Sequence, residues 1–325
     1  MEVSIIIPAY NVESYIVRCL DSIYRDNPSE ELFEVIIIND GSIDNTVTLI
    51  KDYAIHHFNI TLIDKVNEGV SIARNLGIET ARGKYVMFVD ADDELVEGAL
   101  VKVINYLSDH KPMDMLVTRQ IRKNEKRKWI VNAPNLEEHK RYTGIEAYRC
   151  HYVRQNAGGG ICRTDFLRHY QLHFPVGVSN SEDTIFFGLL QVYAQSIIYY
   201  NLALYTINMT ASSASRIDRT KKGLNYVITM KAVAKIKENM DLQSRERRAI
   251  FDSVAYQMLS NTTAEFVASK DLTYSQLRRL IAIKDILPFD TRNMYLKRWE
   301  ARLMNFSFPL FYCSSWLKKQ LHYYL

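Results

Sequence analysis

Apolar segments alternate with helical patterns over the first 108 residues, and this alternation is the feature that most constrains the fold. Four of these segments are short, continuous and rich in β-branched or aromatic residues, as is typical of strands buried on both faces. They are 3–7, 34–39, 60–64 and 84–90. Helical spacing of apolar residues follows at 15–23, 45–57, 70–81 and 95–108. The alternation predicts right-handed βαβ units on a mostly parallel sheet, which is an α/β fold.

The pattern becomes less regular after Met113, and the chain then becomes helical throughout. The elements expected in the irregular part are a strand at 113–118, a basic hairpin within 120–131, helices at 144–152 and 183–194, an extended segment at 158–163 and a strand or strand pair at 197–207. The helices expected after them lie near 219–238, 243–268, 273–284 and 293–303. We therefore predict an α/β domain at 1–215 and a helical region at 216–325.

The two predicted parts differ in charge. Residues 1–215 carry 21 Lys and Arg against 27 Asp and Glu, whereas residues 216–325 carry 20 against 10, so the net charges are −6 and +10. The basic part is expected to face an anionic partner. Because no nucleic-acid-binding motif accompanies it, we do not expect that partner to be a nucleic acid.

Cysteine spacing and hydropathy bear on the compartment. The four cysteines lie far apart with no Cys-x-x-Cys pair, so neither a zinc knuckle nor a disulfide framework is indicated. The N-terminus has no basic segment followed by a long apolar one, as a signal peptide would, and no run of about 18 apolar residues predicts a membrane span. These features favour a cytoplasmic protein.

Polar residues follow three of the four predicted strands, at 8–11, 39–42 and 90–94. Ligands of open α/β sheets bind at the carboxyl ends of the strands, where these residues are expected to meet. A single Asp after a strand is ordinary helix capping, but three polar strand ends favour a binding site.

The last of these strand ends holds four carboxylates in five residues: Asp90, Asp92, Asp93 and Glu94. Carboxylates this close repel one another unless a cation is present, and oxygen ligands suit Mg²⁺ or Mn²⁺. We expect Asp92 to be the metal ligand. Asp93 and Glu94 are expected to cap the helix that follows.

Five segments, in this order and spacing, resemble family 2 glycosyltransferases with the GT-A fold, a Rossmann-like sheet flanked by helices. They are VSIIIPAYN (3–11), IINDGSIDNT (37–46), NEGVSIARNLG (67–77), YVMFVDADD (85–93) and SEDTIFF (181–187). The resemblance implies an inverting hexosyl- or N-acetylhexosaminyltransferase of bacterial surface-polysaccharide assembly. It implies a nucleotide-diphosphate sugar as donor, most often a UDP-sugar, and a divalent cation as cofactor.

The resemblance assigns the donor site to Pro8, Ala9, Tyr10, Asp40, Arg74, Asp90, Ala91 and Asp92. Tyr10 would lie along the nucleoside base, and Asp40 would hydrogen-bond to it. Arg74 would orient the nucleotide and Asp90 the ribose, while Asp92 would bind the metal at the diphosphate. The alternatives are core packing for Tyr10 and an exposed helix position for Arg74.

The resemblance also assigns the general base to Asp183, with Glu182 as the other candidate. Inversion is a single displacement, so one carboxylate must deprotonate the acceptor hydroxyl. The metal would absorb the charge that develops on the leaving diphosphate. Without the resemblance both acids would be taken as stabilising the start of a helix.

Three segments leave the acceptor side open. Gly158–Gly160 replace the bulky and basic residues usual in the family, so they permit either close approach of a ligand or a flexible turn. Residues 212–222 contain four cations and are either a lid over the diphosphate or a linker. Aromatic and basic residues in 304–325 suit contact with the inner face of the membrane, packing against the catalytic domain or a dimer contact.

The expected acceptor is a hydroxyl of a glycan or lipid-linked glycan. A nucleotidyltransferase is the rival enzyme, but residues 8–15 lack the Gly and Lys of a phosphate loop. A non-catalytic sugar-nucleotide-binding assembly protein is the rival of another class. The transferred sugar, the linkage and the oligomeric state do not follow from the sequence.

Overall fold

We analysed the chain in a computed structural model. The residues that the structure describes are 1–131, 134–152, 156–178, 181–209, 219–239, 244–269, 273–280, 287 and 298–315. They fall into two compact units. The first comprises Met1–Tyr152, Asn156–Val176 and Tyr193–Ala211, and the second comprises Val153–Gln155, Gly177–Val192 and Ser212–Leu325.

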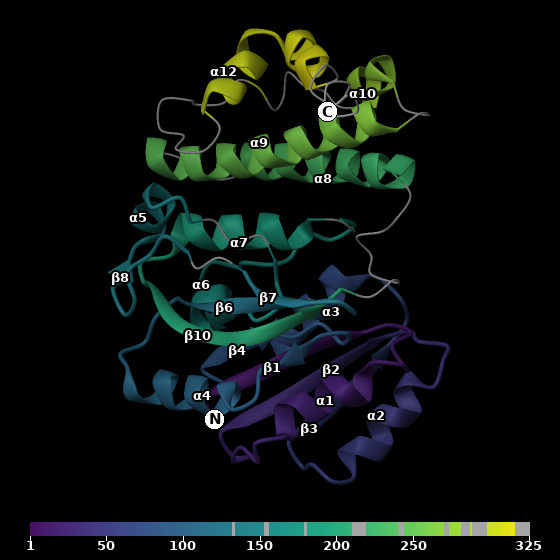
Figure 1. The fold of residues 1–325 in the computed structure, drawn as a ribbon, viewed down its shortest axis with the longest axis vertical. Coiled ribbons are helices and arrows are strands. Elements are labelled where there is room, and N and C mark those ends of the chain that lie inside the picture. The colour runs from purple at the N-terminus through teal and green to yellow at the C-terminus, as the bar shows by residue number, and fades with distance from the viewer. Residues whose placement is uncertain are drawn as a thin grey trace. The chain divides into compact units, whose positions relative to one another are not determined.

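A mixed sheet runs through the first unit in the order β3-β2-β1-β4-β9-β6-β10-β5, with β7 paired to β6 and β8 to β10. The N-terminal strands β1 (Val3–Ala9), β2 (Phe33–Asp40), β3 (Ile60–Lys65) and β4 (Tyr85–Phe88) pair in parallel (Figure 1). The others are β5 (Glu94–Leu95), β6 (Met115–Lys123), β7 (Lys128–Ile130), β8 (Arg141–Tyr142), β9 (Ile161–Arg163) and β10 (Ile197–Asn208). β9 is antiparallel to both β4 and β6, and β6 is parallel to β10, so β1, β4, β6 and β10 all point the same way.

Helices flank this sheet. They are α1 (Ile16–Tyr24), α2 (Thr46–Ala54), α3 (Val70–Thr80), α4 (Ala99–Asp109), α5 (Gly144–Arg149) and α6 (Thr164–His169). The alternation along β1 explains their placement, because successive side chains of a strand point to opposite faces. Val3, Ile5 and Ile7 join the cluster that includes α1 and α4, whereas Ile6 lies against Gly77 of α3.

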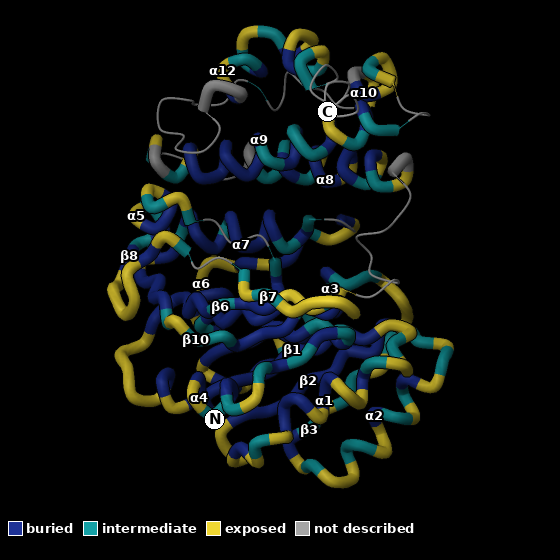
Figure 2. Tube along the Cα trace, viewed as in Figure 1, coloured by how far each residue is buried: buried dark blue, intermediate teal, exposed yellow. Residues whose placement is uncertain are grey.

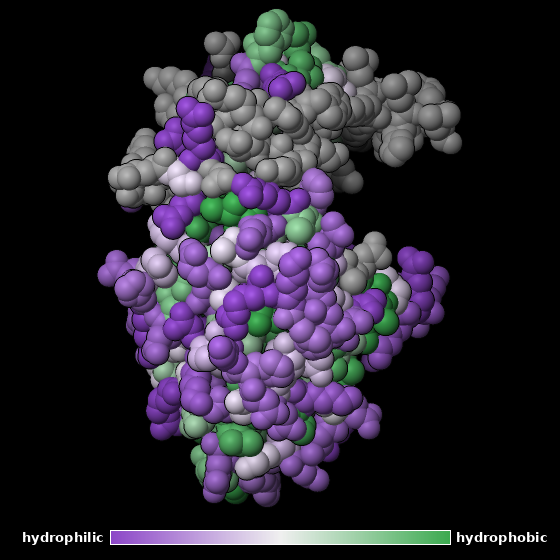
Figure 3. Space-filling model, turned by 90° about the vertical axis from the view of Figure 1, so that its left-hand side faces the viewer, coloured by the Kyte–Doolittle hydropathy of each residue, from purple (hydrophilic) through white to green (hydrophobic). Residues whose placement is uncertain are grey.

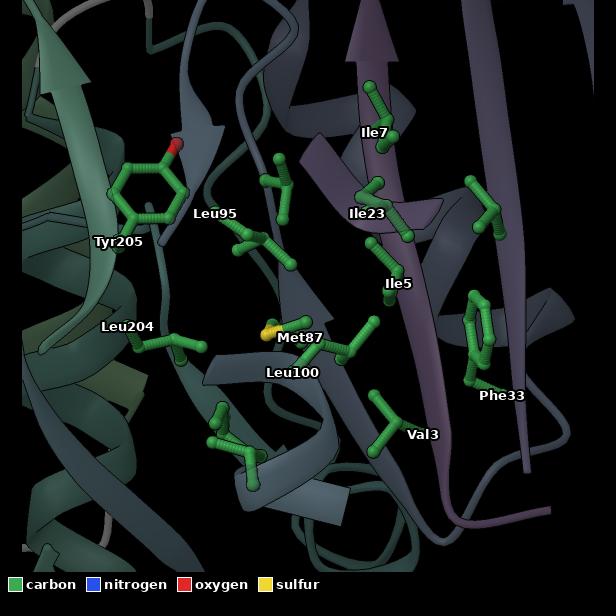
Figure 4. Packing of buried hydrophobic residues seen from close by; sticks show 14 of the residues in the cluster. Val3, Ile5, Ile7, Ile23, Phe33, Met87, Leu95, Leu100, Leu204 and Tyr205 are labelled. Carbon is green, nitrogen blue, oxygen red and sulfur yellow. The ribbon is translucent and has the colours of Figure 1, made fainter. Parts of the chain in front are cut away.

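The core of the first unit is the cluster between the sheet and the helices α1 and α4. Figure 4 shows Val3, Ile5 and Ile7 along β1, with Met87 and Leu100 beside them. β2 and β4 are buried along their whole length and β1 at every residue except Pro8, as the dark tube in Figure 2 shows. Burial on both faces is the reason that these strands have continuous apolar sequences.

The second unit is helical. Its described elements are α7 (Glu182–Tyr193), α8 (Arg219–Asn239), α9 (Arg245–Ala268), α10 (Tyr274–Leu280) and α12 (Arg298–Phe306), and residues 308–315 are also helical. α8 packs against α9, and Gly188 of α7 admits the side chain of Val254. Apolar side chains of these helices form one buried cluster around Phe251 and Phe266. The second unit thus has a core of its own.

The α/β class with a mostly parallel central sheet is confirmed. The predicted hairpin within 120–131 is present as β6 and β7, and the predicted helices after residue 216 are present where the structure describes the chain. The division into 1–215 and 216–325 stays a prediction. In the described structure, the second unit also includes α7.

The described surface does not carry a single large apolar area on the face drawn in Figure 3, where apolar patches are scattered among hydrophilic side chains. Among the helices in the described part of the chain, none is both long enough and apolar enough to cross a membrane.

Candidate active site

The order of the strands indicates which edge of the sheet is suited to binding a ligand. The chain builds β1, β2 and β3 in one direction and then returns to place β4 on the other side of β1. At such a reversal the connections leave the neighbouring strands to opposite sides, so a ligand is expected to bind at the carboxyl ends of these strands. The ends of β1 and β4 lead into residues 8–11 and 90–94, where the sequence predicts the donor site.

Hydrogen bonds connect the loop after β1 to the loop after β2. The backbone N–H of Asn11 donates to Ser42 Oγ at 2.9 Å, and the Asn11 side-chain oxygen accepts from the Ile43 N–H at 2.9 Å. Asn11 has a positive φ of 50°, a conformation that Asn tolerates better than most residues. Next to it, Tyr10 is half exposed at 50%, so it is not a core residue, whereas Ala9 is buried.

Asp40, at the end of β2, anchors the start of α3. Its carboxylate accepts hydrogen bonds from Lys65 Nζ at 2.7 Å and from the backbone N–H groups of Glu68 at 2.9 Å and Gly69 at 2.8 Å. Burial of Asp40 opposes ionisation, but these hydrogen bonds and the charge of Lys65 outweigh it and lower the pKa of Asp40. The side chain predicted to contact the nucleoside base is therefore an ionised, firmly positioned acceptor.

Arg74 of α3 pairs with Asp90 after β4. The distance from Arg74 Nη2 to Asp90 Oδ1 is 2.8 Å, and the guanidinium lies 5.1 Å from the centre of the Phe174 ring. Arg74 is only 5% exposed, so the alternative of an exposed helix position is wrong. The structure brings the two predicted donor-site residues together as an ion pair.

The carboxylates after β4 are crowded. Burial raises the pKa of Asp92, and the charge of Asp90 raises it further. Burial also raises the pKa of Asp93, to about 8, with the charges of Asp90 and Asp92 adding to the effect. Ionisation of Asp92 and Asp93 is thus unfavourable in the protein alone, and a bound cation would favour it.

The acidic side chains after β4 are the candidate ligands of a divalent metal. In the described part of the chain, no three Asp, Glu, His or Cys side chains gather as a complete protein metal site requires. Mg²⁺ and Mn²⁺ at phosphates often take only one or two carboxylates, the rest being phosphate oxygens and water. Asp92 with its acidic neighbours fits that partial ligand set.

Asp93 and Glu94 do not cap the following helix, so that prediction is wrong. α4 begins only at Ala99, after a Gly98 whose N–H donates to Asp26 Oδ2. Asp93 Oδ1 instead accepts from the Asn208 N–H at 2.7 Å, and Glu94 belongs to β5, which pairs with β10. β10 lies more than 100 residues after β5 in the sequence, so no local pattern predicts this pairing.

Two residues outside the predicted site fix the backbone of this acidic loop. Arg18 of α1 donates from Nη2 to the Asp92 carbonyl oxygen at 2.8 Å, and its Nε lies 3.2 Å from Glu94 Oε1. Asn208, the last residue of β10, donates from Nδ2 to the same carbonyl oxygen at 3.1 Å and to Glu94 Oε1 at 3.0 Å. Together they hold the chain from which the Asp92 side chain projects.

Tyr205 of β10 supports the same loop from inside the protein. It is fully buried, and its hydroxyl accepts from the Asp90 N–H at 2.9 Å and hydrogen-bonds to the side chain of Asp93. The glycines at 158 and 159 make room for its ring: a Cβ at Gly158 would lie 2.5 Å from Tyr205 Cε1, and one at Gly159 would lie 2.8 Å from Tyr205 Cβ. In the structure these glycines admit a buried tyrosine.

The residues that the sequence analysis missed carried weak signals. Asn208 and Lys65 follow predicted strands directly, so the rule used for Asp40 and Asp90 would have included them. Arg18 lies one turn into a helix with no local sign of its role, because its partners are 74 and 76 residues away. Tyr205 lies within the strand predicted at 197–207, and nothing in the sequence around it indicates its role.

The two candidate bases lie at the start of α7, in the second unit. Glu182 is buried at 9% exposure, and Asp183 is half-buried with its Oδ1 accepting from the Thr184 N–H at 2.7 Å. Both positions also suit acids that stabilise a helix N-terminus.

The two open segments near the C-terminus lie only partly in the described chain. Of the segment 212–222, expected to be a lid or a linker, residues 212–218 lie outside the described residues, and Lys222 pairs with Glu265 at 3.2 Å within the second unit. Of the aromatic segment, Phe308 and Phe311 are buried in the core of the second unit, among the helices that surround them. Phe306 is 82% exposed, and residues 316–325 lie outside the described residues.

The sequence of this chain is similar to those of known glycosyltransferases. Residues 4–164 match the sequence model described as "Glycosyl transferase family 2". The chain is also 37% identical over 144 residues to "Uncharacterized glycosyltransferase EpsJ" of Bacillus subtilis (strain 168), an alignment that covers 44% of this chain and 41% of EpsJ. The chain spans about two fifths of the length of the first curated relatives that it matches.

Two solved structures share the fold. The S. aureus TarS fragment 1–349, solved in complex with UDP-GlcNAc, is 20% identical with a TM-score of 0.76, and the match covers 99% of this chain and 92% of that one. The mannosyltransferase PcManGT from Pyrobaculum calidifontis, in complex with GDP-Man and Mn²⁺, is 18% identical with a TM-score of 0.56, covering 94% and 87%.

The matched region contains β1 to β4, the carboxyl ends of β1 and β4 and the acidic loop that follows. The likeness to both solved structures confirms the predicted fold class. The match over residues 4–164 confirms the family resemblance inferred from the short motifs. Residues 4–164 of this chain therefore form a glycosyl transferase family 2 domain.

Proposed function

We propose that the chain is an inverting glycosyltransferase that moves a hexosyl or N-acetylhexosaminyl group from a UDP-sugar to a hydroxyl of a glycan or lipid-linked glycan. The single observation that carries the proposal is the ion pair between the buried Arg74 and Asp90 just after β4, next to the loop that carries Asp92. Membership of the family agrees with a transferase, and the TarS fragment was solved with UDP-GlcNAc.

The nucleoside is expected to bind at the ends of β1 and β2. Asp40 is ionised and would accept a hydrogen bond from the base, and the half-exposed ring of Tyr10 would pack along it. Asp90 keeps a third of its side chain exposed beside Arg74, which leaves a carboxylate oxygen for the ribose hydroxyls.

Asp92 is the residue that would bind Mn²⁺ or Mg²⁺, together with diphosphate oxygens of the donor. The cation would supply positive charge where the leaving diphosphate becomes more negative. PcManGT, which shares the fold, was solved with Mn²⁺. The crowding of carboxylates around Asp92 supports this assignment.

The chemical step requires a base for the acceptor. Asp183 would take the proton of the acceptor hydroxyl, and that oxygen would attack the anomeric carbon as the bond from this carbon to the diphosphate oxygen breaks. One new bond forms on the face opposite the leaving group, so the configuration inverts. Glu182 is the second candidate for this base.

The proposed place of action is the cytoplasmic face of a bacterial membrane, where surface polysaccharides are assembled. Phe306 at the end of α12 and Leu310 in the helical segment 308–315 are exposed apolar residues, which is consistent with peripheral membrane contact. Contact of this kind is part of the proposal for the acceptor, since a lipid-linked glycan would be presented at that surface.

The test is donor binding and turnover by the full chain. Isothermal titration with UDP should show binding in Mn²⁺ that weakens at least 10-fold in excess EDTA and in Asp92→Asn. UDP release from a panel of nucleotide sugars should then identify the donor. Wild-type protein that binds no nucleotide with or without Mn²⁺ would overturn the proposal.

A further inference from the structure

The hairpin formed by β6 and β7 carries a concentration of positive charge that the donor site does not use. We call residues 122–129 the basic hairpin. Its turn is closed by Asn124, whose side-chain oxygen accepts from the N–H groups of Lys126 at 3.0 Å and Arg127 at 2.9 Å. The turn is thus ordered by local hydrogen bonds and presents its side chains in a defined arrangement.

The charge of the basic hairpin contrasts with the rest of its domain. Five of the 21 Lys and Arg residues of 1–215 lie between 122 and 128, with Glu125 as the one acid among them, while the whole of 1–215 has a net charge of −6. All five cations are exposed. In the part of the chain that the structure describes, only Lys123 of these five has an ion-pair partner, Glu94 at 4.0 Å.

One face of the hairpin places like charges together. Lys123 and Lys128 are directly opposite each other across the antiparallel pair, an arrangement that destabilises a hairpin in the absence of an anion. The cost is small in water, because exposed charges are screened. An anionic group between the two ammonium groups would turn this repulsion into attraction.

The other face combines an aromatic ring with two guanidinium groups. Trp129 lies directly opposite Arg122, and the Arg127 guanidinium lies 4.8 Å from the centre of the Trp129 ring. Arg binds phosphate and carboxylate groups through two parallel N–H donors, and an indole ring offers an apolar surface. A ligand that alternates apolar and anionic parts matches this face.

The basic hairpin begins beside the donor site. Lys123 is aligned with Asn208 at the ends of β6 and β10, and Lys123 O accepts from the Met209 N–H at 2.8 Å. Asn208 in turn donates to the carbonyl of Asp92 at 3.1 Å. Since β4, β6 and β10 point the same way, the hairpin extends from the same edge of the sheet as the acidic loop.

We propose that the basic hairpin binds the acceptor, and that this acceptor is an anionic polymer whose repeating units carry phosphodiester or carboxylate groups. The proposal rests on the proposed function, because the hairpin is placed beside a donor site. The position favours an acceptor over a nucleic acid or an anionic membrane, either of which needs no donor nearby.

The test compares two triple variants of the full chain that lose the same charge. The hairpin variant is Lys126→Ala/Arg127→Ala/Lys128→Ala, and the control is Lys51→Ala/Lys102→Ala/Lys111→Ala, three exposed cations elsewhere in the first unit. Binding is measured at low salt to poly(glycerol phosphate), to polygalacturonate and to neutral dextran. We expect wild type and control to bind one or both anionic polymers but not dextran, and the hairpin variant to bind at least about 10-fold more weakly.

The variant Arg127→Lys/Lys128→Arg conserves the charge of the hairpin and should keep most of the affinity for the anionic polymer. It is the control that separates loss of charge from loss of folding. UDP affinity should be equal in all four proteins. If wild type binds UDP but neither anionic polymer, or if the hairpin variant binds them as well as the control, the inference is overturned while the proposed function stands. If the hairpin variant loses affinity only for RNA or for phosphatidylglycerol vesicles, the inference is also overturned. Absence of UDP binding in wild type would count against the proposed function instead.

Discussion

The Tyr205 hydroxyl accepts a hydrogen bond from the backbone N–H of Asp90 at 2.9 Å, although 115 residues separate them. The same hydroxyl hydrogen-bonds to Asp93, so one buried phenol holds both ends of the acidic loop on which Asp92 lies. The proposed donor site therefore depends on β10, a strand that follows the matched family region in the sequence, since that region ends at residue 164. This relationship leads to the first prediction.

Tyr205→Phe removes the hydroxyl and leaves the ring. The lost hydrogen bonds should lower the free energy of unfolding by about 1–2 kcal/mol and weaken UDP binding in Mn²⁺, because the Asp92 loop loses its support. Urea unfolding and titration calorimetry measure the two effects. Tyr199→Phe is the matched control, since it loses one hydrogen bond to Asn201 on the same strand. Equal UDP affinity in the two variants would contradict the supporting role of Tyr205.

Gly158→Ala should destabilise the protein because its methyl group meets the ring of Tyr205. The required shift of a fully buried ring predicts a loss of about 1–3 kcal/mol in urea unfolding. Gly98→Asn is the comparison: Gly98 has a φ of 69° and open space around it, and Asn tolerates this conformation. A smaller effect at Gly158 than at Gly98 would show that the tyrosine does not constrain the glycine.

Asp93 should make stability depend on pH. Its folded-state pKa of about 8 lies above its ordinary value, so the folded protein binds the proton more tightly than the unfolded chain does. Its contribution to stability is therefore complete at acid pH and is lost as the pH rises towards 8, by at most about 1.4 kcal/mol per pH unit. Asp93→Asn should flatten this dependence and be more stable than wild type at pH 8.

Urea unfolding at pH 5, 6.5 and 8 in EDTA measures this effect without a bound cation. The control is Asp109→Asn, an exposed acid at the end of α4, which should keep the pH dependence of the wild type. Parallel curves for wild type and Asp93→Asn would show that Asp93 is ionised throughout this range.

Arg18→Ala should weaken donor binding through the backbone of the acidic loop. Its ion pair with Glu94 is partly exposed and is worth about 1 kcal/mol or less, so a decrease in UDP affinity of a few fold is expected. Arg25→Ala is the matched control on the same helix, because Arg25 reaches the carbonyl of Leu95 rather than that of Asp92. If calorimetry shows the same loss for both, the contact with Asp92 is not what matters.

Asp183→Asn should abolish transfer while leaving donor binding intact. Loss of a general base reduces the rate by about 10²–10⁴-fold, and the amide preserves the hydrogen bond to the Thr184 N–H. Glu182→Gln should have a much smaller effect in the same turnover assay. The reverse ranking of the two variants would assign the base to Glu182.

The sequence alone determined the layered α/β fold and most of the donor-site candidates. Continuous apolar strands and helical periodicity are local patterns, and Asp40, Asp90 and Asp92 lie at or just after the ends of predicted strands. Their convergence is a property of parallel strands, whose carboxyl ends share one edge. The five motifs added the family, which the match over residues 4–164 confirms.

Only the tertiary structure decided how the site is held. Asp93 and Glu94 look like helix caps until β10 is placed beside them, and Gly158–Gly159 look like a loop until the ring of Tyr205 fills the space. Arg18 and Asn208 reach the acidic loop from 74 and 116 residues away. Local patterns report the state of the backbone near each residue, whereas these roles arise from contacts between distant segments. Such contacts exist only once the sheet has been assembled.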